Sequence, residues 1–93
     1  MANWSFITNH GAVLAVIAQN HVIKAADIAA QLDITERSVR RVIADLTSAG
    51  YITKKYKGGV NNYQINPDLP LRRKMQESVK VKELLNGLGL TCE

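Results

Sequence analysis

The sequence predicts an α+β fold that is mainly α-helical and carries one small β-hairpin. Apolar residues recur at helical spacing up to Gly50, the period then changes to two, and a Gly-Gly pair divides this second pattern. At 93 residues the chain has the length of a single domain with a small core. A composition of 46% hydrophobic and 22% charged residues excludes a disordered or collagen-like chain.

The first helix is expected over about residues 8–19. Val13 and Ile17 lie four residues apart and begin one apolar stripe, which small alanines flank. Thr8 and Asn9 are both residue types that favour the N-cap position. The helix is therefore expected to begin at one of these two residues.

A second, short helix is expected over residues 25–32. Ile28 and Leu32 lie on one of its faces, and Asp27 is favourably placed near its positive end. The preceding residues 21–24 are too few for more than an edge strand.

A sharp turn at Asp33 is expected to lead into a third helix over residues 36–49, because aspartate tolerates the left-handed conformation better than most residues. Thr35 is the expected N-cap of this helix. Gly50 is suited to end it in a left-handed conformation, with Tyr51 folding back as the apolar contact. The face expected to be buried consists of residues spaced i, i+3, i+4 and i+7: Val39, Val42, Ile43 and Leu46.

Two strands are expected over residues 51–57 and 60–65, because both stretches are rich in β-branched and aromatic residues. Gly58 and Gly59 separate them and are typical of a tight hairpin. Tyr63 and Ile65 alternate onto one face.

The order helix, short helix, tight turn, helix and hairpin is that of a winged helix-turn-helix. Residues 1–66 are expected to form this DNA-binding domain. Residues 67–93 are expected to supply a linker and an added C-terminal helix that serves dimerisation. Within this tail, we expect residues 71–76 to be partly extended and residues 78–88 to be helical.

The charge of the chain is concentrated in one stretch. The formal net charge is +4, and residues 36–57 alone carry six bases and two acids. Such a patch is the electrostatic footprint of a polyanion-binding surface. With its apolar face turned inward, the third helix leaves Arg37 and Arg41 outside, one turn apart. Their guanidinium groups match the acceptors of guanine in the major groove of DNA.

These observations predict a sequence-specific, double-stranded DNA-binding regulator of transcription, with residues 35–49 in the major groove and residues 51–65 beside it as a wing. The expected DNA-binding residues are Thr35, Arg37, Ser38, Arg40, Arg41, Lys54, Lys55, Lys57, Asn61 and Asn62. The competing interpretation of the helix is a solvated face with Glu36–Arg40 and Arg41–Asp45 pairs. The competing interpretation of the hairpin lysines is that they protect an edge strand against aggregation.

The chain resembles the small winged helix-turn-helix regulators of prokaryotes, broadly MarR-like, in a single-domain form. The resemblance covers nearly the whole chain and rests on residues Trp4–His10, Asp27–Ala29, Ile34–Arg37, Ala44–Leu46, Ala49–Tyr51, Asn62–Tyr63, Leu69–Arg72 and Glu83–Leu85. It implies a DNA-binding regulator that dimerises through its terminal segments. The chain departs from the family at the wing tip, which has Gly58-Gly59-Val60-Asn61-Asn62 in place of arginines, and at Asp33, where glycine is usual.

A homodimer is expected because the small core leaves an apolar stripe of the tail uncovered. The stripe consists of Val81, Leu84, Leu85 and Leu88. Trp4 and Phe6 fit equally well a satellite core cluster and a part of the dimer surface.

Other functions are not indicated. His10 and His21 have no cysteine or acidic cluster nearby, so we expect no metal. No phosphate loop, carboxylate pair or nucleophile–base motif suggests an enzyme or a cofactor. Cys92 cannot form an internal disulfide, and no apolar run is long enough to cross a membrane, so we expect a cytoplasmic protein. The sequence identifies no small-molecule effector.

The alternative function is a winged-helix module that binds protein within a larger complex. DNA binding that depends on salt separates the two possibilities. RNA binding is disfavoured, because the exposed surface lacks clustered aromatic residues.

Overall fold

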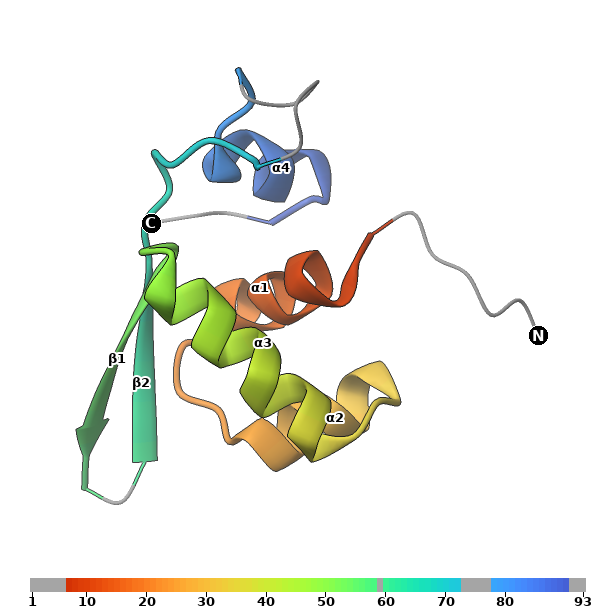
Figure 1. Ribbon diagram of the computed structural model, residues 1–93, viewed down its shortest axis with the longest axis vertical. Helices are drawn as coiled ribbons and strands as arrows, with labels where there is room; N and C mark the ends of the chain where they lie inside the picture. Colours follow the sequence, from red (N-terminus) through yellow and green to blue (C-terminus); the bar gives the residue numbers. More distant parts are fainter. Residues whose placement is uncertain (1–6, 59, 73–77, 91–93) are drawn as a thin grey trace.

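The computed structural model describes residues 7–58, 60–72 and 78–90. The predicted α+β fold is confirmed, with a hairpin and an added C-terminal helix (Figure 1). Trp4, Phe6, Cys92 and most of the expected extended segment 71–76 lie outside the described residues. The elements are α1 (Asn9–Gln19), α2 (Ala25–Leu32), α3 (Glu36–Ser48), β1 (Ile52–Lys57), β2 (Val60–Ile65) and α4 (Val81–Gly87).

The predicted helix caps are confirmed for α1 and α3. The hydroxyl oxygen of Thr8 accepts a hydrogen bond from the backbone N–H of Gly11 at 3.4 Å. Thr35 does the same for the N–H of Ser38 at 3.1 Å. Each cap satisfies one backbone donor that has no partner within its own helix.

The two predicted backbone reversals around α3 are also confirmed. Asp33 follows α2 in the left-handed conformation, with φ 55° and ψ 45°. Gly50 follows α3 with φ +84°. Its N–H donates to the carbonyl of Thr47 at 3.1 Å, while the N–H of Tyr51 donates to Leu46 at 2.9 Å. This is the Schellman arrangement, and it turns the chain directly into the hairpin.

The strands β1 and β2 pair in antiparallel register from Ile52↔Ile65 to Lys57↔Val60. The structure begins β1 one residue later than predicted, because the N–H of Tyr51 is used to end α3. Residues 21–24, which are too few for more than an edge strand, form a single bridge between Val22 and Asn62.

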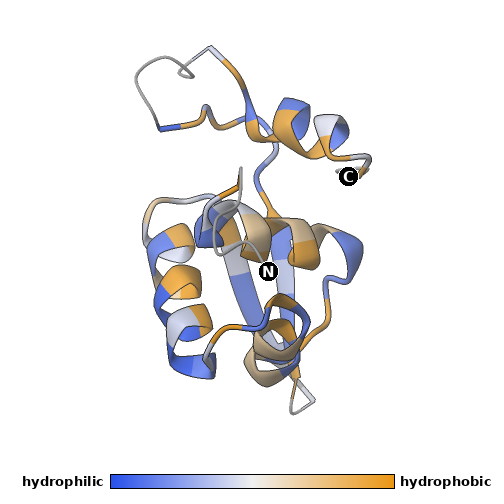
Figure 2. Cartoon of the chain, turned by 90° about the vertical axis from the view of Figure 1, so that its right-hand side faces the viewer, coloured by the Kyte–Doolittle hydropathy of each residue, from blue (hydrophilic) through white to orange (hydrophobic). Residues whose placement is uncertain are grey.

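The core lies between α1, α2, α3 and the hairpin, which form one body with α4 at one end (Figures 1 and 2). Tyr63 and Ile65 share a buried strand face, as predicted. The whole predicted inner face of α3 is buried as well: Val39, Val42, Ile43 and Leu46.

The C-terminal helix corrects one prediction. Val81 and Leu85 were expected to lie on an uncovered stripe, but they are 1% and 0% exposed and belong to the core of their own chain. Leu84 is half-buried and Leu88 is 41% exposed, so only these two residues of the stripe are not fully covered.

Backbone hydrogen bonds hold the start of α4 against the segment that follows β2. The N–H of Leu71 donates to Val79 at 2.8 Å, and the N–H of Val81 donates to Leu69 at 2.9 Å. These bonds, with a bridge between Pro70 and Lys80, keep the chain extended up to Lys80. The helix therefore begins at Val81, three residues later than predicted.

Candidate nucleic-acid interface

The candidate site begins on the outer face of α3, which lies in front of α1 and α2 with the hairpin at its side (Figure 1). The inner face of α3 packs on the core, which directs the polar residues outward. Arg37, Arg41, Ala44 and Ser48 are all exposed on the same face. The structure thus brings together the two arginines predicted to meet DNA bases.

Arg40 lies on the flank of this face. Its Nε and Nη2 atoms donate to Oε2 of Glu36 at 2.9 and 2.6 Å, which confirms the predicted pair. Both side chains are exposed, so the pair contributes little to stability. The Arg40 charge also acts on Tyr63 of β2.

The second predicted pair, Arg41–Asp45, is absent. Oδ2 of Asp45 instead contacts Nε2 of His10 at 2.8 Å, because the first turn of α1 lies beside the C-terminal half of α3. Within the described part of the chain, neither Arg37 nor Arg41 has an ion-pair or hydrogen-bond partner. As far as the described residues go, both guanidinium groups are available to bind an anion or a base edge.

Thr35 and Ser38 are joined at the start of α3. The Thr35 hydroxyl donates to the Ser38 hydroxyl oxygen at 2.9 Å, while its own oxygen accepts from the Ser38 N–H. This pairing fixes the N-terminus of α3. The Ser38 hydroxyl retains its hydrogen for a further acceptor.

The hairpin register divides the predicted wing residues between two faces. Lys54 lies opposite the buried Tyr63, so it shares the face that turns toward the helices. Asn61 lies on this same face. Lys55 and Asn62 lie opposite each other on the other face. The sequence prediction treated these residues as one DNA-binding surface, whereas the structure divides them between two faces.

Tyr56 is a candidate that sequence reasoning missed. It lies opposite Asn61, on the same face as Lys54, and is 74% exposed. The signal in the sequence was the alternation that starts at the buried Ile52. Residues 52, 54 and 56 must share a face, so an aromatic side chain accompanies Lys54 beyond the core.

Tyr63 of the hairpin is influenced by the charge of Arg40 on α3, so it relates the two elements of the site. Burial raises the pKa of its hydroxyl, while a hydrogen bond with the Asn61 side chain and the Arg40 charge oppose the shift. The phenol therefore stays protonated and neutral beside Arg40.

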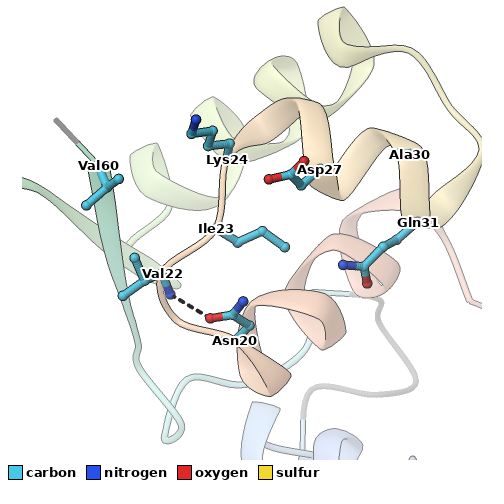
Figure 3. Close-up of a pocket in the computed structure, with 8 residues that line it drawn as sticks. All are labelled: Asn20, Val22, Ile23, Lys24, Asp27, Ala30, Gln31 and Val60. Carbon is cyan, nitrogen blue, oxygen red and sulfur yellow. Dashed lines mark hydrogen bonds between the residues drawn. The ribbon is translucent and has the colours of Figure 1, made fainter.

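Away from this face, a hollow of about 440 Å³ lies between α2 and the hairpin (Figure 3). The hollow is open to solvent, and both polar and apolar residues line it. At one edge, the side-chain oxygen of Asn20 accepts a hydrogen bond from the N–H of Val22 at 3.2 Å. Its lining residues are Asn20, Val22, Ile23, Lys24, Asp27, Ala30, Gln31 and Val60.

The two histidines have partners within the chain. His10 contacts Asp45, and Nδ1 of His21 lies 3.0 Å from the carbonyl oxygen of Tyr63. Over residues 7–58, 60–72 and 78–90, no group of three potential ligands could hold a metal ion. In the same ranges, no helix has the length and apolar character needed to span a bilayer.

The helix pair α2–α3, the two-stranded wing and the free arginines of α3 define a winged helix-turn-helix protein, a class that binds DNA. Comparison with known families matches residues 12–60 to the HTH domain, from α1 to the start of β2. The chain belongs to this family of DNA-binding domains. The match supports a DNA-binding regulator without singling out the MarR-like branch. Comparison with curated proteins found no match.

Proposed function

We propose that this protein is a sequence-specific, MarR-like regulator of transcription that binds double-stranded DNA in the cytoplasm. The observation that carries the proposal is the pair Arg37 and Arg41, exposed one turn apart on α3 with no partner among the described residues. In this proposal α3 enters the major groove and the hairpin lies beside it.

The chemistry of base recognition follows from this face. A guanidinium group can donate two parallel hydrogen bonds to O6 and N7 of guanine. Ala44 and Ser48 share the face with the arginines and are small, so they do not hold the duplex away. Each arginine is proposed to recognise one guanine of the bound site.

The residues around this face are proposed to contact phosphates, which fix the orientation of the protein on DNA without reading its sequence. Thr35 and Ser38 do so at the N-terminus of α3, where the helix dipole favours an anion. The candidates for these contacts are Arg40 on the flank and, on two opposite faces of the wing, Lys54, Lys55, Lys57, Asn61 and Asn62.

A homodimer is proposed to bring two such surfaces to one DNA site, with residues 1–66 binding DNA and residues 67–93 supporting dimerisation. Val81 and Leu85 are committed to the core, so the open side of α4 would supply the contact through Leu84 and Leu88. Sedimentation of the wild type and of a Leu84→Asp, Leu88→Asp variant tests this. A wild-type monomer at tens of micromolar, or a variant that dimerises equally well, contradicts it.

Selection of bound duplexes from a random pool tests the proposed function. The wild type should select guanine-containing sites, and a dimer should select a pseudo-palindrome with half-sites about one helical turn apart. Arg37→Ala and Arg41→Ala should each cost about 1–3 kcal/mol on the selected site and relax one position per half-site. Arg40→Ala is the control for base preference: Arg40 is exposed and paired with Glu36, and as a proposed phosphate contact its loss should lower affinity without changing the selected bases. An unchanged base preference in both arginine variants would contradict the proposal.

A further inference from the structure

We propose that the wing holds DNA with one face only, the face that turns toward α3, and that Tyr56 is a DNA contact on this face together with Lys54. The partner of this surface is the sugar–phosphate strand that borders the groove entered by α3. This inference rests on the proposed function and deepens it, since it names the contact surface of the wing.

The hairpin register establishes the two faces. On the inner face, the pairs Ile52↔Ile65 and Lys54↔Tyr63 run from the core toward the tip. Ile52, Ile65 and Tyr63 are buried, whereas Lys54 is exposed. The inner face therefore begins as core and continues beyond the core as a polar surface.

This inner face adjoins the recognition helix. Of the two strands, β1 packs on α3 and β2 packs on α1. Lys54 and Tyr56 both belong to β1 and lie on the strand face that they share with Tyr63. From the other side, Arg40 of α3 lies close enough to Tyr63 for its charge to act on the phenol. Lys54 on the wing, which lies opposite Tyr63, and Arg40 on α3, whose charge acts on Tyr63, are thus both cationic groups related to this residue.

The chemistry of this face suits a sugar–phosphate strand. Lys54 supplies a positive charge, and the Tyr56 hydroxyl can donate a hydrogen bond to a phosphate oxygen. The ring of Tyr56 is 74% exposed, so it has no packing role that would explain an aromatic residue here. A deoxyribose offers an apolar surface against which such a ring can pack.

The opposite face provides a matched comparison. Lys55 is adjacent to Lys54 in the sequence, carries the same charge and is likewise exposed. It lies on the other face of the hairpin, opposite Asn62. A general electrostatic attraction would use the two lysines alike. A contact surface on one face would use only Lys54.

The test measures the affinity of four variants for one duplex over a range of salt concentrations: Lys54→Ala, Lys55→Ala, Tyr56→Phe and Tyr56→Ala. Lys54→Ala should reduce the steepness of the log–log salt dependence by about 0.9, the loss of one phosphate contact. Lys55→Ala should leave it near the wild-type value. Tyr56→Phe should weaken binding at least about tenfold if the hydroxyl bonds a phosphate. Tyr56→Ala should weaken it at least as much.

Two outcomes would overturn the inference: equal effects of Lys54→Ala and Lys55→Ala, or wild-type affinity in both Tyr56 variants. All substituted side chains are exposed, so thermal unfolding should show unchanged folding. An Arg37→Ala, Arg41→Ala variant separates this result from the proposed function. If that variant loses affinity while the Tyr56 variants do not, the function stands and the wing surface is wrong. If it also binds as the wild type does, the proposed function fails.

Discussion

His10 of α1 and Asp45 of α3 are joined across the domain by a contact of 2.8 Å between Nε2 and Oδ2. Asp45 is four residues after Arg41, the spacing at which the two would otherwise pair along the helix. The histidine therefore holds the carboxylate away from an arginine that the proposed function requires to be free.

Replacement of His10 should weaken DNA binding without removing any DNA contact. In His10→Ala, Asp45 is free to pair with Arg41, which should cost up to about 0.5 kcal/mol of binding free energy. Asp45→Ala should bind at least as tightly as the wild type, and His10→Ala should have no further effect in that background. Fluorescence anisotropy on a fixed duplex measures these differences. A similar loss in the double variant would show that the Asp45 carboxylate is not the cause.

Gly50 should be sensitive to alanine because of its backbone conformation. Its φ is +84°, and an added Cβ would meet only Leu69 Cδ1 at an ordinary 3.8 Å. The expected loss of about 1–2 kcal/mol in unfolding free energy therefore comes from the left-handed backbone. Gly87→Ala in α4 is the control, since a Cβ there meets nothing within 4 Å and the φ is not left-handed. Urea denaturation should show no loss for the control.

The covered side of α4 should matter to the stability of the domain itself. Leu85 is 0% exposed, so Leu85→Ala should lower the unfolding free energy by about 2–5 kcal/mol. Leu88 is 41% exposed, and Leu88→Ala should cost less than about 1 kcal/mol. Chemical denaturation at a single protein concentration compares them. Equal, small losses would mean that α4 does not pack on the body.

Stability at high pH should depend on Tyr63. Because burial raises the pKa of this hydroxyl above its ordinary value of about 10, the folded state retains the proton longer than the unfolded state. The resulting stability is fully present below pH 10 and is lost as the pH rises toward the folded pKa. The unfolding free energy of Tyr63→Phe should fall less steeply above pH 10 than that of the wild type. Identical curves for Tyr63→Phe and the wild type would refute the prediction.

The features that the sequence predicted correctly depend on local interactions. Thr35 caps α3 through a backbone N–H three residues away, and Gly50 ends it through bonds within one turn. Asp33 adopts the left-handed conformation that its short polar side chain tolerates. The buried face of α3 follows from the spacing of its apolar residues. Such features need no knowledge of what lies across the domain.

The features that the sequence did not predict depend on distant partners. Asp45 pairs with His10, which lies 35 residues away, so the local alternative Arg41 was expected instead. Val81 and Leu85 were expected to be open, because the core residues that bury them lie far away in the sequence. Tyr56 was not predicted as a site residue for a different reason. The lysines on either side of it indicate a charged strand, whereas the role of Tyr56 depends on the strand face that it shares with Lys54.

The central claim is that α3 and the wing form a DNA-binding surface, and the salt dependence of affinity for duplex DNA tests it most directly. About three phosphate contacts per protomer predict a log–log slope near −3 for a single bound protomer and near −5 for a dimer. The duplex should be bound most tightly at low salt, and an Arg37→Ala, Arg41→Ala variant should be weaker throughout. A slope near zero between low and physiological salt would contradict the account, because binding without phosphate contacts would leave the charge of residues 36–57 without a role.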